Sequence, residues 1–116
     1  MGVDLVMNDQ AAHMMPVVVE LPAEIDVTNS GQIYDQLVAA LAPGVHIVVA
    51  DLTATSFCDS SGVRALMHAY EGADACGIQL RLAVTGEGSV RRVLQLTGVE
   101  RVMPVYLDLK EALHAD

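Results

Sequence analysis

The chain has 116 residues, of which 53% are hydrophobic, and this length and composition predict a single domain that folds by itself. Its formal net charge of −9, from six Lys and Arg against fifteen Asp and Glu, argues against nucleic acid as a partner, as does the lack of Trp. No apolar run is long enough to cross a membrane as a helix, because Pro43-Gly44 interrupts the longest uncharged stretch, residues 36–50.

The first fifteen residues have no strong periodicity. Val3–Met7 could add a short edge strand, and otherwise we expect this segment to be mobile. Its acidic residues are unlike a secretory signal, and Val6 stands where a myristoylation signal has Ser or Thr. We therefore expect a cytoplasmic protein whose domain spans residues 16–114.

Short runs rich in β-branched residues and Leu predict four strands. They are Pro16–Leu21, His46–Leu52, Ile78–Val84 and Val102–Tyr106. Pro104 within the last run predicts that this strand lies at a sheet edge, because proline cannot donate a hydrogen bond to a neighbour.

Apolar residues spaced i, i+3, i+4, i+7 predict three helices between these strands. Their expected buried stripes are Tyr34, Leu37, Val38 and Leu41; Val63, Leu66, Met67 and Tyr70; and Val90, Val93, Leu94 and Thr97. A capping-box-like sequence predicts a fourth helix, and it comprises Asp108–Glu111 followed by Ala112 and Leu113. Strands that alternate with helices imply an α/β fold with about four helices on a largely parallel, mixed sheet of four or five strands.

Polar residues and glycines mark the ends of these helices. Asn29 or Ser30 can cap the first helix and Ser89 the third, while Gly98 can close the third. Cys58 and Cys76, the only two cysteines, have no metal-ligand spacing, and we expect both to be reduced thiols in the core.

Asp59-Ser60-Ser61-Gly62 stands where a strand and loop lead into a helix, and it has three interpretations. A hydrolase nucleophile elbow reads Gly-x-Ser-x-Gly, but Cys58 occupies the position of the first glycine. A plain helix cap needs one serine, not the whole string. A serine placed for phosphorylation is the third reading, because the positive end of a helix accepts a phosphate while a partner packed on that surface does not.

Two other features have ordinary explanations. The loop Thr85–Val93 contains Gly86-x-Gly88, but Arg91 replaces the third glycine of a dinucleotide fingerprint, so a plain turn is favoured over nucleotide binding. The doublet Arg91-Arg92 is read as a solvated helix face, and the alternative is contact with an acidic partner. No metal ligands are expected from the scattered histidines, which are His13, His46, His68 and His114.

The run DLTATSFCDSSGV, residues 51–63, resembles the signature of the STAS domain, and specifically of bacterial anti-sigma factor antagonists. The segments AEIDVTNSGQIYDQL, residues 23–37, and VRRVLQLTGVERVMPVYLDLKEAL, residues 90–113, resemble the family on either side of it. Coverage is essentially residues 16–113. Ala23 replaces the usual Gly, and Cys58 replaces the commoner large aliphatic residue or Met.

This resemblance implies a STAS-type single domain that acts in partner switching, a form of transcription regulation in stress responses. The unphosphorylated protein would bind an anti-sigma factor that is also a serine kinase, and a sigma factor would be released. Phosphorylation at Ser60, with Ser61 as secondary candidate, would abolish binding, and a serine phosphatase would reset the protein. No catalytic residue, cofactor, metal, nucleic acid or membrane is implied.

The resemblance also places a docking surface around the acceptor serine, comprising Asp26, Asp59, Ser61, Gly62 and Arg64. Arg64 lies four residues after Ser60, and on a helix this spacing brings a cation within reach of the serine. The alternative function is a STAS scaffold or adaptor in a stress-sensing or transport complex, whose serines are only structural.

Overall fold

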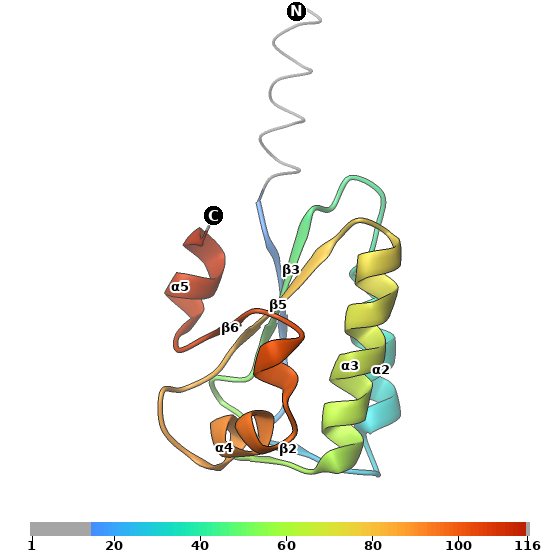
Figure 1. Ribbon diagram of the computed structural model, residues 1–116. Helices are drawn as coiled ribbons and strands as arrows, with labels where there is room; N and C mark the ends of the chain where they lie inside the picture. Colours follow the sequence, from blue (N-terminus) through green and yellow to red (C-terminus); the bar gives the residue numbers. More distant parts are fainter. Residues whose placement is uncertain (1–14, 116) are drawn as a thin grey trace, which may run out of the picture.

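The computed structural model describes residues 15–115, which form a parallel four-stranded sheet with helices on both faces (Figure 1). The strands follow the order β1-β3-β5-β6, and their bounds are Val17–Glu20 for β1, Ile47–Asp51 for β3, Gln79–Ala83 for β5 and Val105–Tyr106 for β6. The predicted α/β class is confirmed. The edge position of β6 agrees with the expectation from Pro104, whereas Val3–Met7 lies outside the described residues.

Four α-helices are present in the described part of the chain, in agreement with the expected number. They are α2 (Ser30–Ala39), α3 (Ser60–Ala75), α4 (Ser89–Leu96) and α5 (Leu109–His114), and a 3₁₀ turn, η1, spans Val99–Arg101. Helices α2 and α3 lie side by side against one face of the sheet, while α5 lies on the other (Figure 1). None of the helices between residues 15 and 115 is long and apolar enough to span a bilayer.

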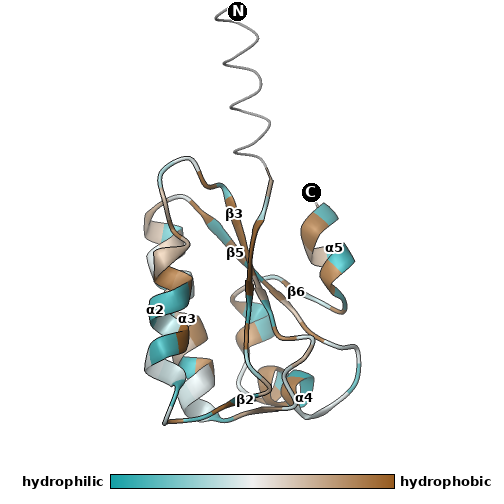
Figure 2. Cartoon of the chain, turned by 180° about the vertical axis from the view of Figure 1, so that it is seen from behind, coloured by the Kyte–Doolittle hydropathy of each residue, from teal (hydrophilic) through white to brown (hydrophobic). Residues whose placement is uncertain are grey.

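The core is divided by the alternation of side chains along the strands. Val48 and Leu80 point toward the larger cluster under α2 and α3, whereas Val49 and Ala83 point the other way and contact Ala112 of α5. Figure 2 shows the central strands as largely hydrophobic, as expected for strands that are covered on both faces.

A second, two-stranded parallel pair was not predicted from the sequence. It joins β2 (Glu24–Ile25) to β4 (Phe57–Cys58), and Ile25 is paired with Cys58. Each strand has only two residues, too few for an alternating pattern. The pair is important for the site because it holds the segment that precedes α2 beside the segment that precedes α3.

The buried stripe of α2 differs from the expected one. Ile33 and Leu37 are 3% and 1% exposed, whereas Tyr34 and Val38 are 37% and 38% exposed. The helix is therefore rotated by about one residue, because Ile33 fills the core that Tyr34 was expected to fill. Thr97 is likewise exposed and lies just beyond the end of α4, where its hydroxyl donates to the carbonyl of Val93.

The helix ends also differ in detail. Asn29 occupies the cap position of α2, but its side chain bonds to Asp26 and Glu24 instead of to the helix. Gly88, with φ of 122°, caps α4 in place of the expected Ser89, whose hydroxyl donates to the Ser56 carbonyl at 2.7 Å. The expected ends at Gly98 and Asp108 are confirmed, with φ of 79° at Gly98 and a side-chain cap at Asp108.

The two cysteines lie in different environments. Cys58 is 3% exposed, as expected, but Cys76 is exposed at the C-terminal cap of α3, so the expectation of two core thiols is wrong for Cys76. At that position the helix has ended and the backbone turns through Gly77 before it enters β5, which leaves the thiol in solvent.

Candidate functional site

Helix α3 begins at an aspartate cap. Asp59 has an extended backbone, and its carboxylate accepts hydrogen bonds from the backbone N–H groups of Ser61, at 2.9 Å, and Gly62, at 3.3 Å. Neither serine therefore caps the helix, contrary to the cap interpretation of the sequence. Ser60 and Ser61 are instead the first two residues of the helix, where the helix dipole is positive.

The two serine hydroxyls differ in what they contact. The hydroxyl of Ser61 donates to the same Asp59 oxygen, and the residue is half-buried. Ser60 is exposed, and its hydroxyl forms no hydrogen bond with any of the described residues. The Ser60 hydroxyl is therefore accessible to solvent, whereas the Ser61 hydroxyl is bound to the capping carboxylate of Asp59.

The electrostatics of the cap favour a charged carboxylate. The Ser61 hydroxyl is the largest influence that lowers the pKa of Asp59, the backbone N–H groups of Gly62 and Ser61 act in the same direction, and partial burial opposes them. Asp59 is therefore ionised at neutral pH and remains an acceptor for all three donors.

The same local turn recurs at two other strand ends. Asp26, which follows β2, accepts from the N–H and hydroxyl of Thr28, and Asp51, at the end of β3, does so from Thr53. An aspartate followed two residues later by Ser or Thr closes such a turn without help from distant residues. Within residues 15–115, no group of three or more His, Cys, Asp or Glu side chains is placed to hold a metal ion.

Gly62 allows the first turn of α3 to sit directly on the β2–β4 pair. A Cβ atom at this position would lie 2.6 Å from Cys58 Sγ and 2.7 Å from Ile25 Cγ2. The thiol beneath it is buried, and burial, followed by the nearby Asp59 carboxylate, raises the pKa of Cys58 to about 11. Gly62 therefore sets the height of the serines above the sheet and does not itself offer a contact surface, since it is buried.

A shallow groove lies between α2 and α3 and is lined at one point by Ser61. The α2 side comprises Val27, Ser30, Gly31 and Tyr34, and the α3 side comprises Ser61, Arg64, Ala65 and His68. The Tyr34 and His68 rings meet edge to face, with centroids 6.5 Å apart. We call this surface the α2–α3 groove.

The structure brings most of the predicted site residues to this end of the molecule. Ser61 and Arg64 line the groove, and Asp26 and Asp59 each follow one strand of the β2–β4 pair. Sequence reasoning missed Val27 and Tyr34. The sequence did contain an indication of them, since the segment around α2 has more apolar residues than one buried stripe can hold. Val27 is one of the residues left over, and it is 77% exposed.

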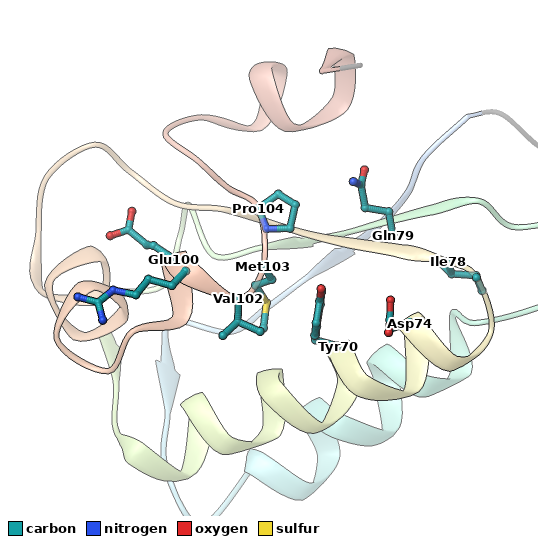
Figure 3. Close-up of a pocket in the computed structure, with 10 residues that line it drawn as sticks. Tyr70, Asp74, Ile78, Gln79, Glu100, Val102, Met103 and Pro104 are labelled. Carbon is teal, nitrogen blue, oxygen red and sulfur yellow. The ribbon is translucent and has the colours of Figure 1, made fainter.

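A different cleft lies along the C-terminal half of α3 (Figure 3). Tyr70 and Asp74 rise from the helix and face Val102, Met103 and Pro104, which precede β6. No predicted site residue lines this cleft.

The loop before α4 forms a third hollow, lined in part by Gly86, Gly88 and Arg91. The Arg91 guanidinium donates to the Gly86 carbonyl at 2.9 Å, so this arginine holds its own loop. This contact agrees with the interpretation of the segment as a plain turn.

The chain belongs to the STAS domain family, whose model matches residues 5–112. Among solved structures, it is similar to an anti-sigma factor antagonist from Mycobacterium paratuberculosis, with 30% identity, a TM-score of 0.74 and coverage of 84% of this chain and 82% of that one. It is also similar to a STAS domain protein from Planctomyces limnophilus, with 26% identity, a TM-score of 0.73 and coverage of 88% and 90%.

A further similar structure is the anti-sigma factor antagonist SpoIIAA in its unphosphorylated form, with 26% identity, a TM-score of 0.68 and coverage of 85% of each chain. A sulfate transporter family protein from Wolinella succinogenes shares the fold at 18% identity. No curated protein matches the chain significantly.

Proposed function

We propose that this protein is an anti-sigma factor antagonist controlled by phosphorylation of Ser60. In the unphosphorylated form it binds an anti-sigma factor that is a serine kinase, and this binding releases a sigma factor. Phosphorylation ends the complex, and a serine phosphatase restores it. The similarity to the Mycobacterium paratuberculosis antagonist, over most of both chains, and to SpoIIAA, which was solved in its unphosphorylated form, supports this function.

The observation that carries the proposal is the difference between the two serines. A kinase needs a hydroxyl that it can reach and orient, and the exposed, unbonded hydroxyl of Ser60 meets this need. The Ser61 hydroxyl would first have to leave Asp59, whose carboxylate also repels an incoming phosphoryl group. Ser60 is therefore the acceptor that we assign, and Ser61 the weaker candidate.

The first turn of α3 explains how phosphorylation acts on binding and not on the fold. A phosphoryl group on Ser60 would lie at the positive end of the helix dipole, which is favourable to an anion. A partner that had desolvated a neutral hydroxyl would instead face about two negative charges. At about 4 Å from a like charge, and at an effective dielectric near 20, repulsion of about 4 kcal/mol lowers affinity about a thousandfold.

In this proposal the protein contributes a surface and an acceptor hydroxyl, while the kinase and the phosphatase supply the chemistry. It would act in the cytoplasm, where its partners and ATP are present. The contact with the anti-sigma factor would include or adjoin Asp26, Asp59, Ser61 and Arg64. Gly62 would contribute indirectly, because its packing on Cys58 and Ile25 fixes the start of α3.

The test is phosphorylation by a purified anti-sigma factor kinase with ATP, followed by mass-spectrometric mapping. We expect one phosphate on the parent protein and on Ser61→Ala, and none on Ser60→Ala. Binding of the same kinase should be retained by Ser60→Ala and lost by Ser60→Asp. Equal binding of the parent, Ser60→Ala and Ser60→Asp would contradict the switch and favour the alternative of a STAS adaptor with structural serines.

A further inference from the structure

The α2–α3 groove places exposed apolar side chains beside one of the few cations of this protein. Its α2 side is uncharged and carries two exposed apolar side chains, Val27, which is 77% exposed, and Tyr34, which is 37% exposed. Its α3 side carries Arg64, one of only six Lys and Arg residues in a chain with a net charge of −9. Arg64 is exposed, and none of the described residues forms an ion pair with it.

Charge complementarity therefore defines what fits this groove. Apolar side chains of a partner would cover Val27 and Tyr34, and a carboxylate beside them would pair with Arg64. A partner segment with a second cation at this point would be repelled, while one with no charge would leave the guanidinium desolvated without a partner.

The position of Arg64 on the helix also brings it close to Ser60. Residues i and i+4 have their Cβ atoms about 6 Å apart, and side chains on a helix lean toward its N-terminus, so the guanidinium can reach a group on Ser60. An acid at i followed by a base at i+4 is the favourable order. A phosphoserine with three acceptor oxygens is a stronger partner for arginine than a carboxylate.

We propose that Arg64 is shared between two mutually exclusive ion pairs: with a carboxylate of an anti-sigma factor segment that docks its apolar side chains in the α2–α3 groove, and with the phosphate on Ser60. Phosphorylation then removes the cation on which the partner depends, in addition to repelling that partner. This inference rests on the proposed function, because it takes Ser60 as the phosphorylated residue.

The intramolecular pair can be tested without any partner. Phosphoserine is incorporated at position 60 during translation, and ³¹P NMR titration follows ionisation of the phosphate in the parent, in Arg64→Gln and in Arg101→Gln. Pairing with Arg64 favours the dianion, so we expect the second dissociation constant of the phosphate to be about threefold larger in the parent and in Arg101→Gln than in Arg64→Gln. Equal constants in all three proteins would overturn the pair.

The intermolecular pair is tested with the anti-sigma factor kinase that phosphorylates the protein. For the unphosphorylated protein, Arg64→Gln should weaken binding about tenfold, and phosphorylation should then weaken it about tenfold less than in the parent. If repulsion alone acts, phosphorylation weakens both proteins equally, or weakens Arg64→Gln more. Loss of the phosphate effect in the parent itself would instead refute the proposed function.

The apolar side of the groove has a matched control. Val27→Ser and Leu96→Ser both replace a highly exposed apolar side chain, 77% and 79% exposed, and neither side chain supports the core. We expect Val27→Ser to weaken binding of the same kinase about tenfold and Leu96→Ser to leave it unchanged. Equal affinities of the two variants would show that the partner does not occupy the groove.

Discussion

At the scale of single residues, the site depends on how closely α3 approaches the β2–β4 pair. Gly62 has no side chain, and this is why Cys58 and Ile25 can lie directly beneath the first helical turn. The same contact places Asp59 where its carboxylate can both cap the helix and hold Ser61. Gly62 thus fixes how closely the first turn of α3 packs on the β2–β4 pair, while the hydrogen bond to Asp59 is what distinguishes Ser61 from the solvent-facing Ser60.

Gly62→Ala should destabilise the protein by about 1–3 kcal/mol, because the added methyl overlaps two buried side chains. Gly31→Ala is the matched control in α2, where a Cβ atom has nothing within 4 Å. It should be neutral or stabilise by up to about 1 kcal/mol, since alanine is the better helix former. Urea unfolding followed by circular dichroism measures both, and equal effects would contradict the proposed packing.

Cys58 should make stability depend on alkaline pH. Below about pH 9 its thiol is neutral in both the folded and the unfolded protein, so the thiol does not reduce the free energy of unfolding. As the pH rises from 9 toward 11, the unfolded chain releases the proton while the folded protein keeps it, so unfolding becomes more favourable by up to about 1.4 kcal/mol per pH unit.

The free energy of unfolding of the parent should therefore fall over this range more steeply than that of Cys58→Ala. Cys76→Ala is the control, because Cys76 is exposed, and its slope should match that of the parent. A parent slope no steeper than that of Cys58→Ala would show that burial does not hold the thiol proton.

At the scale of elements, α5 is fixed to the sheet by an unexpected buried arginine. Arg81 in β5 is 2% exposed, its guanidinium donates to the Ala112 carbonyl of α5 at 2.7 Å and to Gln79 at 2.6 Å, and it lies 5.7 Å from the centre of the Tyr106 ring. No carboxylate of the described residues pairs with it. Its hydrogen bonds therefore compensate for burial, and one of them crosses to the helix.

Arg81→Met keeps the volume but removes the donors. We expect a loss of about 2–3 kcal/mol and, because the lost bond ends in α5, faster hydrogen exchange there than in α3. Arg101→Met, at an exposed position in η1, should change neither quantity. Uniformly faster exchange over all helices would show that Arg81 supports the whole core and not the attachment of α5 in particular.

The elements that the sequence predicted most directly are those long enough to show a period or a continuous apolar run. Helix α3 repeats its buried side over sixteen residues, and β3 and β5 are apolar runs, so all three could be recognised. The two-residue strands β2 and β4 could not, because each stands among polar residues, whereas β6, which is equally short, lies in the predicted run 102–106. Pairing between β2 and β4 brings Val27 beside α3. The sequence therefore predicted the motif around Ser60 but could not predict the groove next to it.

The roles of the individual side chains in the motif Asp59-Ser60-Ser61-Gly62 could not be predicted from the sequence either. Both Asp and Ser are good helix caps, so propensity alone could not decide that Asp59 caps α3. The difference between Ser60 and Ser61 arises from one hydrogen bond, between the Ser61 hydroxyl and Asp59, which only the folded structure defines.

At the scale of the whole molecule, the candidate site lies at one end of the fold, and we expect phosphorylation of Ser60 to leave the fold intact. A negative charge on Ser60 meets the positive end of α3, so Ser60→Asp should change the free energy of unfolding by no more than about 1 kcal/mol, toward greater stability.

Ser61→Asp is the matched comparison, one residue away. Its carboxylate would replace a hydroxyl that donates to Asp59, so a hydrogen bond becomes a repulsion between like charges, and we expect a loss of about 1–2 kcal/mol. Added salt should recover part of this loss, because the charges are partly exposed. Urea unfolding at low and high salt distinguishes the two variants. If Ser60→Asp lost as much stability as Ser61→Asp, a phosphate on Ser60 would act by loosening α3, and the switch would work through the fold instead of through the surface.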